Sequence, residues 1–259
     1  MYRSYGVISR MSALRRASSG GVTLRRRAGT LLRLPAGILL VSWQYFWRIT
    51  ALHRSETRGD EGDLPPPIPP DAVDERSKLL SDGVGPMFHR RFRVRIVGAR
   101  MSAGELAATV AANPNRAAPW TVAVFVKTRG ERGKLRVGDE YRVQMPGPWD
   151  GPVRVVHSGP ASFRLGTLRG HLEAGQIQFS ARATGDGALE FQVEAWSRAG
   201  DRMAALLYSR LRVAKEIQFN MWVHFCLNAA AFSGGRPSGG VVIETRGVPA
   251  GLCRDADGR

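Results

Sequence analysis

A long stretch without glycine or proline near the end of the chain constrains the fold most. Residues 202–232, "RMAALLYSRLRVAKEIQFNMWVHFCLNAAAF", number 31 and predict one continuous helix, about 46 Å long at about 1.5 Å per residue. Ser233, Gly234 and Gly235 follow it, and glycine commonly occupies the position after a helix C-terminus. A helix of this length must bury one side against another layer.

The helical wheel gives this helix one apolar side. Its expected members are Met203, Leu206, Leu207, Ala214, Ile217, Met221 and Phe225. Charged and polar residues such as Arg212 and Lys215 fall on the opposite side or its flank. If the apolar side is buried on a sheet, each large residue contributes roughly 2 kcal/mol to stability.

Segments with strand-like alternation precede the helix. The first lies within residues 83–99, where a glycine and proline turn leads into an arginine-rich strand with Phe92, Val94 and Ile96 on one face. A short helical stretch follows at residues 102–112. Six more strands are expected at residues 121–127, 139–145, 153–157, 162–168, 176–183 and 188–196. Short breaks rich in turn residues separate the later ones, such as "GDGA" at 185–188, so consecutive hairpins and an antiparallel sheet are expected.

This order of elements predicts an α+β helix-grip fold, in which a curved antiparallel sheet wraps around the long C-terminal helix. We expect the helix-grip domain to span residues 83–235. The other expected regions are a disordered basic tail (1–30), a short apolar helix (31–54), a proline-rich acidic linker or arm (55–82) and a C-terminal tail (236–259). The space between such a sheet and its helix is often an apolar cavity, where a ligand would bind.

Positive charge is concentrated at the start of the chain. The net charge is +16, but residues 1–54 hold ten arginines and no acidic residue, and the remaining residues carry only +6. The pattern of the tail arginines does not form an aromatic platform for stacked bases, so nucleic-acid binding is not favoured.

The apolar run at residues 36–47 lies between Arg33 and Arg48 and is shorter than the about 20 residues that span a bilayer. It predicts a docked or interfacial helix. A membrane anchor, with peripheral membrane contact through residues 34–54, stays open as an alternative.

Cys226 and Cys253, the only cysteines, are far apart in the sequence and accompany no other soft ligand. Neither a disulfide framework nor a metal site is therefore expected, and no cofactor is implied. Two cysteines without a disulfide pattern are typical of a protein in a reducing compartment. A cytoplasmic location is therefore expected, with membrane association as the alternative.

His171 and Glu173 lie two positions apart in "GTLRGHLEAGQIQF". They are the candidates for a general acid or base with an orienting carboxylate. Gly170 and Gly175 bracket them, however, and the pattern favours a hairpin tip whose polar groups hold a loop. The sequence therefore assigns no catalytic residue.

Candidate ligand contacts come from the apolar side of the long helix and of the last strands. On the wheel, His224 lies beside Met221, and Asn228 follows one turn later. Either these two polar side chains line a cavity, or they are buried and hydrogen-bonded as part of the structure. The remaining candidates are Phe179, Phe191 and Trp149, the last in "PGPWDG" as an aromatic lid or a packed strand connection.

The strings "VGDEYRVQMPGPWDGPVRVV", "GTLRGHLEAGQIQFSA" and "AWSRAGD" resemble the uncharacterised bacterial and plant family known as domain of unknown function family 1990. The resemblance covers residues 83–232, and residues 34–54 are similar to an extension of actinobacterial members. It implies a fold similar to the START and major birch allergen group, whose members bind hydrophobic ligands or catalyse cyclisation. It implies no established activity.

Together, these features predict a domain that binds an apolar small molecule or lipid between the sheet and the C-terminal helix. Two alternatives from other classes stay open. One is an enzyme that acts on such a ligand through His171 and Glu173 or through His224, and the other is a membrane-associated interaction module that uses residues 34–54.

Overall fold

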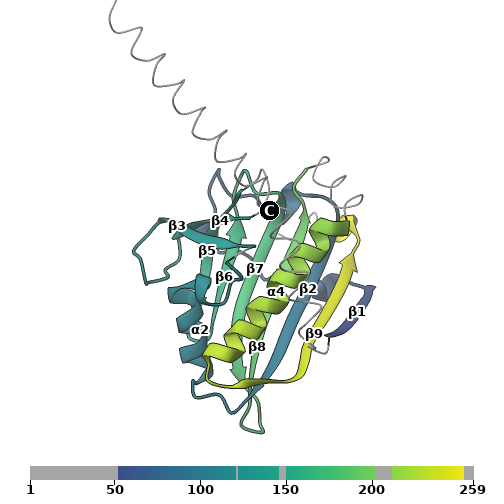
Figure 1. Ribbon diagram of the computed structural model, residues 1–259. Coiled ribbons are helices and arrows are strands. Elements are labelled where there is room, and N and C mark those ends of the chain that lie inside the picture. The colour runs from purple at the N-terminus through teal and green to yellow at the C-terminus, as the bar shows by residue number, and fades with distance from the viewer. Residues whose placement is uncertain (1–51, 121, 146–149, 202–211, 254–259) are drawn as a thin grey trace, which may run out of the picture.

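The computed structural model describes residues 52–120, 122–145, 150–201 and 212–253. These residues form a curved sheet and the helices α2 (Ala103–Ala112) and α4 (Arg212–Phe232) (Figure 1). The strands are β1 (Leu52–Arg58), β2 (Val84–Val97), β3 (Val124–Arg129), β4 (Glu140–Gln144), β5 (Asp150–Gly159), β6 (Ser162–Thr167), β7 (Glu173–Ala183), β8 (Leu189–Ala199) and β9 (Arg236–Val248).

The described strands form one nine-stranded sheet in the order β1-β9-β2-β8-β7-β6-β5-β4-β3. From β3 to β8 each strand pairs antiparallel with the next one in the chain, which confirms the expected series of hairpins. Strand β2 pairs antiparallel with β8 and β9, whereas β1 and β9 are parallel. The β2–β8 pairing brings the first expected strand beside the last one.

Alternation of side chains gives the sheet two different faces. Phe92, Phe179 and Phe191 are fully buried on the face that α4 covers, which we call the concave face. Their neighbours in sequence, such as Arg93 and Gln178, point to the opposite, convex face because successive side chains of a strand alternate.

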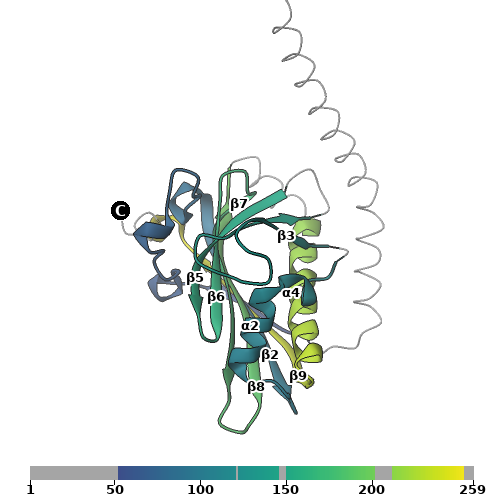
Figure 2. The same cartoon turned by 90° about the vertical axis from the view of Figure 1, so that its left-hand side faces the viewer.

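Helix α4 lies across the concave face, and Figure 2 shows α2 on the same side of the sheet. The ring of Phe219 lies 5.5 Å from the ring of Phe92, and the Cys226 thiol lies 3.7 Å from the backbone oxygen of Phe92. Glycine at position 234 has a φ of 82° and follows the end of the helix, as the sequence predicts. The expected α+β helix-grip fold is confirmed.

A segment between β1 and β2 covers part of the convex face; we call residues 59–82 the arm. Three short 3₁₀ turns shape it, at Glu61–Asp63, Pro70–Ala72 and Leu80–Asp82. The backbone amide of Lys78 donates to the oxygen of Thr167 at 2.9 Å. In Figure 2 the arm, coloured blue, lies on the side of the sheet away from α4.

Residues 236–259 were expected to form a C-terminal tail, and this prediction is wrong for the first part of that range. Residues 236–248 form β9, a strand inside the sheet between β1 and β2. Its buried residues alternate from Val241 through Ile243 to Thr245, all within 2% exposure. Gly239 and Gly240 both have positive φ, beside an irregularity in the β2–β9 register, and the strand continues past them.

The expected boundaries before residue 83 also need correction. Residues 52–54, assigned to the apolar helix, and residues 55–58, assigned to the linker, together form β1, because β9 offers them an open strand edge. Residues 59–82 do not link separate parts, since they pack on the sheet. The folded unit therefore starts at least thirty residues before the expected position.

Several expectations fall outside the described residues. These are the basic tail at 1–30, the apolar helix up to residue 51, the lid residue Trp149 and the first part of the long helix, residues 202–211. Among the helices that are described, none combines the length and the apolar character needed to cross a lipid bilayer.

Candidate functional site

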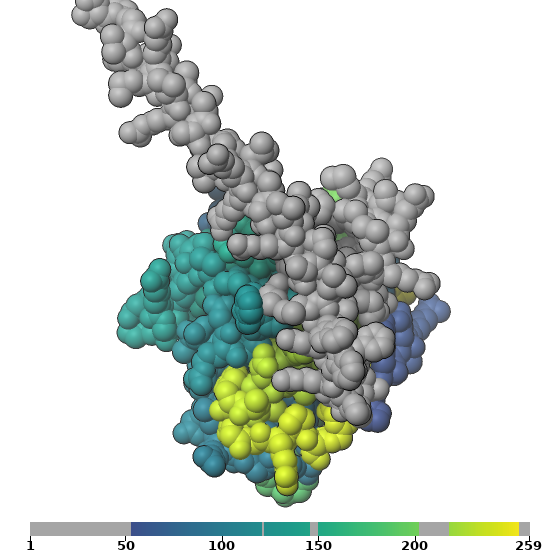
Figure 3. Space-filling model, viewed as in Figure 1, coloured from purple at the N-terminus to yellow at the C-terminus, as the bar shows by residue number. Residues whose placement is uncertain are grey.

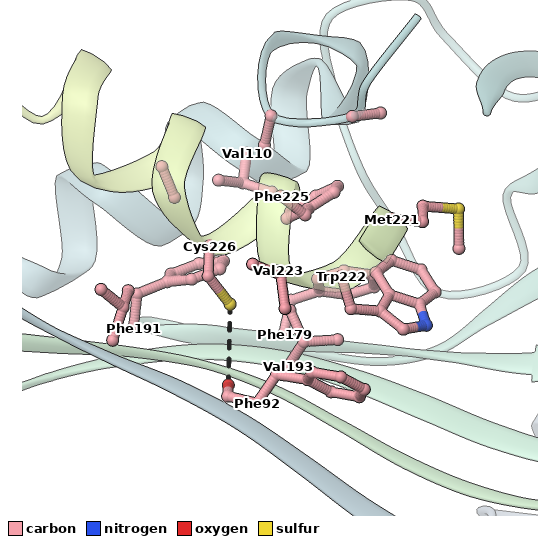
Figure 4. Close-up of a cluster of buried hydrophobic side chains, with 14 of the residues drawn as sticks. Phe92, Val110, Phe179, Phe191, Val193, Met221, Trp222, Val223, Phe225 and Cys226 are labelled. Atoms are coloured by element: carbon pink, nitrogen blue, oxygen red, sulfur yellow. Dashed lines mark hydrogen bonds between the residues drawn. The ribbon is translucent and has the colours of Figure 1, made fainter. Parts of the chain in front are cut away.

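Aromatic side chains fill the middle of the space between the sheet and α4. The Phe179 ring lies 4.8 Å from Phe163 and 5.1 Å from Phe225, and the Phe191 ring lies 6.2 Å from Phe225. Figure 4 shows Phe179 and Phe191 on the strands beneath α4, with Phe225 and Trp222 of the helix beside them. Phe179 and Phe191, two of the expected ligand contacts, are therefore core residues here, and a ligand reaches them only if α4 moves.

The side of α4 that faces the sheet differs from the expected one. Phe219, Trp222 and Cys226 contact sheet residues together with Phe225. The helical wheel includes Phe225 but omits the other three. Their spacing of three and four residues is an apolar helix signal in its own right, but the sequence contains apolar residues around most of this helix and cannot choose among its sides.

Asn228 holds α4 to the segment that follows α2. Its amide nitrogen donates to the backbone oxygen of Ala117 at 2.9 Å, and the guanidinium of Arg116 lies over the ring of Phe232 at 5.0 Å. The yellow-green end of α4 and the teal segment after α2 meet at the surface in Figure 3. Asn228 therefore has a structural partner. His224 and Met221, the neighbouring candidates, are both buried.

A hollow of about 200 Å³ lies at one end of this layer, between α2 and the turn that joins β5 and β6. Its lining is mostly small: Ala107, Ala108, Ala111, Ala112, Gly133, Leu135, Ser158, Gly159, Pro160, Ser162 and Phe163. These residues lie at the opposite end of the strands from His171 and Glu173.

His171 lies in the turn between β6 and β7, where the hairpin interpretation puts it. Gly170 has a φ of 97°, and the amide of His171 donates to the oxygen of Leu168 at 3.0 Å. The ring turns toward the concave side and lies against Gly151: a Cβ at that position would be 2.9 Å from the imidazole Nε2. Glycine at 151 therefore leaves room for the histidine.

The imidazole of His171 is held by the backbone of its own turn. Its Nδ1 accepts a hydrogen bond from the amide of Glu173 at 2.9 Å. Burial lowers the pKa of His171 and outweighs the opposing effect of the Glu173 carboxylate. The same Nδ1 lies 3.1 Å from the backbone oxygen of Glu173, so backbone groups of the turn surround this nitrogen. This geometry favours the loop-holding interpretation over acid–base chemistry.

Glu173 belongs to a group of polar side chains on the concave face. One carboxylate oxygen accepts from the hydroxyl of Ser197 at 3.2 Å, and the other accepts from the amide of Gln218 at 3.1 Å. The amide oxygen of Gln218 in turn accepts from the guanidinium of Arg90 at 3.3 Å. This chain of contacts links β7, β8, α4 and β2.

Thr245 completes this group on β9. It lies directly opposite Arg90 in the register of β2 and β9, so the two side chains are neighbours on one face. We call Arg90, Glu173, Ser197, Gln218 and Thr245 the polar cluster. It adjoins the rings of Phe88 and Phe219, over which the Arg90 guanidinium lies at 4.9 and 5.5 Å.

Glu173 is the only member of the polar cluster that the sequence pattern singled out as a candidate. Arg90 belongs to the arginine-rich first strand, and it is only 4% exposed. The alternation that places Phe92, Val94 and Ile96 on the buried face also places Arg90 there. That pattern was the available signal.

A second group of charged residues lies on the convex face under the arm. The imidazole of His89 lies between two carboxylates, 2.9 Å from Asp63 and 2.8 Å from Glu194, and stacks on Trp196. Burial raises the pKa of Glu194, but hydrogen bonds from His89 and Arg91 outweigh it and hold that pKa below its usual value. Across the described part of the chain, no group of histidine, cysteine or acidic residues is arranged to hold a metal ion.

The chain matches one protein family and is similar to several solved structures. The family described as "Domain of unknown function (DUF1990)" matches residues 62–224, so the match begins within the arm and not at residue 83. No curated protein matches the sequence.

Three similar solved structures have low identity. A protein from Thermobifida fusca is 12% identical with a TM-score of 0.41, over 56% of this chain and 93% of that chain. Major latex-like protein 151 from Panax ginseng is 12% identical with a TM-score of 0.31, over 52% of this chain and 98% of that chain. A norcoclaurine synthase mutant from Thalictrum flavum is 11% identical with a TM-score of 0.39, over 58% and 97%. These values carry no information on activity.

Proposed function

The chain belongs to the DUF1990 family, whose description names no activity, and on that premise we propose that it binds an apolar small molecule or lipid between the sheet and α4. The binding region is the end of the concave face that carries the polar cluster. Helix α4 and the curved sheet flank this end, and Phe88 and Phe219 provide its apolar surface beside Arg90.

One observation supports this proposal above the others: the side chains of the concave face change along its length from apolar to a mixture of polar and apolar. Its middle is packed with aromatic rings and needs no further occupant. At the Gln218 end, polar side chains adjoin apolar rings within the same layer, and such a mixture is typical of sites for ligands with an apolar body and a few polar groups. In a purely structural core, apolar side chains usually fill such positions.

Native mass spectrometry of the full-length chain, purified without detergent, tests the proposal. We expect an added mass that disappears after denaturation and extraction into organic solvent. The extracted protein should then bind the neutral probe Nile red with increased fluorescence. A chain that carries no added mass and leaves Nile red fluorescence unchanged would contradict the proposal.

A matched pair of variants locates the binding region. Phe219→Ala removes an aromatic ring next to the polar cluster and should weaken Nile red binding, whereas Val126→Ala on the edge strand β3 should leave it unchanged. Equal binding by both variants would place the ligand elsewhere. The hollow beside α2 is then the next region to test, with Ala111→Leu as the variant that fills it.

A further inference from the structure

Two buried donors in the polar cluster have no hydrogen-bond partner. Within the described part of the chain, Nε of Arg90 and Oγ1 of Thr245 are both enclosed and unpaired. Arg90 is 4% exposed and Thr245 is 1% exposed, so water does not replace the missing partners at the surface. A buried polar atom without a partner destabilises the folded state, and this cost calls for an explanation.

The two residues that carry these donors lie side by side. Arg90 and Thr245 are directly opposite each other on β2 and β9, and side chains at such positions have Cβ atoms about 5 Å apart. The other polar groups of the cluster are already engaged, since Glu173 accepts from Ser197 and Gln218, and Gln218 accepts from Arg90. What the cluster lacks is therefore an acceptor next to Arg90 and Thr245.

We infer that the polar end of the ligand carries a carbonyl oxygen, as a carboxylate or an ester does, and that this oxygen accepts hydrogen bonds from Arg90 Nε and Thr245 Oγ1. This inference rests on the proposed ligand-binding function. The apolar part of the ligand then lies along Phe88 and Phe219, whose rings adjoin the Arg90 guanidinium.

The chemistry of the donors excludes a ligand whose polar end can only donate hydrogen bonds. The Nε–H of arginine only donates, so a ligand group that only donates, such as an ammonium, leaves Arg90 unpaired and adds a positive charge beside it. A carbonyl or carboxylate oxygen has two lone pairs and can accept from both donors at once. Glu173 lies in the same cluster, so its charge offsets that of Arg90, and a neutral ester is accommodated as well as a carboxylate.

Displacement of Nile red from the full-length, delipidated chain tests the inference. The competitors are decanoate, methyl decanoate and 1-bromodecane, which have similar length but differ in the acceptor at one end. We expect decanoate or methyl decanoate to displace the probe at about fivefold lower concentration than 1-bromodecane, as one or two net hydrogen bonds predict. The ratio between decanoate and methyl decanoate shows whether the acceptor is charged.

Variants assign this preference to the two donors. Thr245→Val keeps the shape of the side chain and removes the hydroxyl, and Arg90→Met removes the guanidinium. Each variant should reduce the fivefold preference to about twofold, because the other donor remains. Arg95→Met on the same strand, which removes a convex-face arginine, should retain it. Because valine matches threonine in shape, Thr245→Val keeps the test valid even if Arg90→Met does not fold.

The outcomes separate the two proposals. If 1-bromodecane displaces Nile red as well as the two carbonyl compounds, or if Thr245→Val keeps the preference, the inference is wrong while ligand binding stands. If Nile red does not bind and no competitor binds by mass spectrometry, the proposed function and the inference both fail.

Discussion

The two faces of the sheet are stabilised in different ways. The concave face buries a continuous set of aliphatic and aromatic side chains under α4 and α2. The convex face has a much smaller apolar cluster, Leu80, Met87, Trp196, Val248 and Cys253, and beside it the arm covers charged side chains. On this face Arg164 donates to the backbone oxygens of Pro66 and Pro67 at 3.1 and 3.2 Å.

The difference shows what each covering element contributes. A helix with an apolar side needs only an apolar partner surface. A small shift of the helix preserves its apolar contacts with that surface. The arm covers polar groups, so each of them needs a specific partner, because an unpaired buried charge is much more costly than an imperfect apolar contact. Arg76 of the arm makes a bidentate contact with Glu140 of β4, and Arg154 of β5 donates to Asp74 of the arm at 2.7 Å, so the arm and the sheet match closely in charge.

The largest effect is expected on the concave face. Phe225→Ala removes a ring that contacts Phe179, Phe191 and Trp222, and we expect the free energy of unfolding to fall by about 3–5 kcal/mol. Urea denaturation measures the change. Val126→Ala, on the exposed edge strand, is the control and should change it by less than about 0.5 kcal/mol.

The convex face should be nearly as sensitive to loss of one charged partner. His89→Leu leaves the carboxylates of Asp63 and Glu194 buried with fewer partners, and we expect a loss of about 3 kcal/mol in the same assay. Arg182→Leu, which breaks an exposed pair with Glu190 on the β7–β8 hairpin, should cost no more than about 0.5 kcal/mol. If His89→Leu and Arg182→Leu lower the free energy of unfolding by equal, small amounts, the contacts between the arm and the sheet contribute little to stability.

The two faces should also lose stability at different pH. Burial lowers the pKa of His171 below its ordinary 6.5, so below that pH the unfolded chain binds a proton that the folded chain does not, and stability falls as pH falls. For Glu194, burial raises the pKa but hydrogen bonds from His89 and Arg91 hold it below the ordinary 4.5, so its contribution is present above that pH and lost below it.

Denaturation curves across this pH range separate the two contributions. His171→Asn should flatten the decline between pH 6.5 and 4.5, and Glu194→Gln should flatten the decline that begins below 4.5. The assignment would be wrong if His171→Asn flattened the decline below pH 4.5, or if Glu194→Gln flattened the decline between pH 6.5 and 4.5.

The smallest effect concerns the polar cluster and has the opposite sign. In the ligand-free chain, Thr245→Val replaces an unpaired buried hydroxyl with a methyl group, and we expect the free energy of unfolding to rise by about 1 kcal/mol. Ser197→Ala is the matched change at a hydroxyl that has a partner, Glu173, and should lower it by a similar amount. A loss of stability in both would mean that Thr245 is paired in solution.

Strand alternation and turn residues were sufficient to predict the central part of the fold. The pattern that runs from Ile177 to Ala183, the turn at Gly187 and the pattern from Leu189 onward predict β7 and β8 without further information, because each depends on neighbours in sequence. The turn that contains His171 belongs to the same class. These features were predicted because local conformational preference and burial agree there.

The sequence by itself therefore determined the meander of strands, the helix-grip order and the buried faces of β2, β7 and β8. Only the tertiary structure decided that residues 236–248 add a strand, that the arm covers the convex face, and that the polar cluster assembles. The bond from Gln176 to Pro66 joins positions 110 residues apart, and that from Arg90 to Gln218 joins positions 128 apart. Such partners leave no periodic signal in the chain, because distant segments meet only after the sheet has closed around α4.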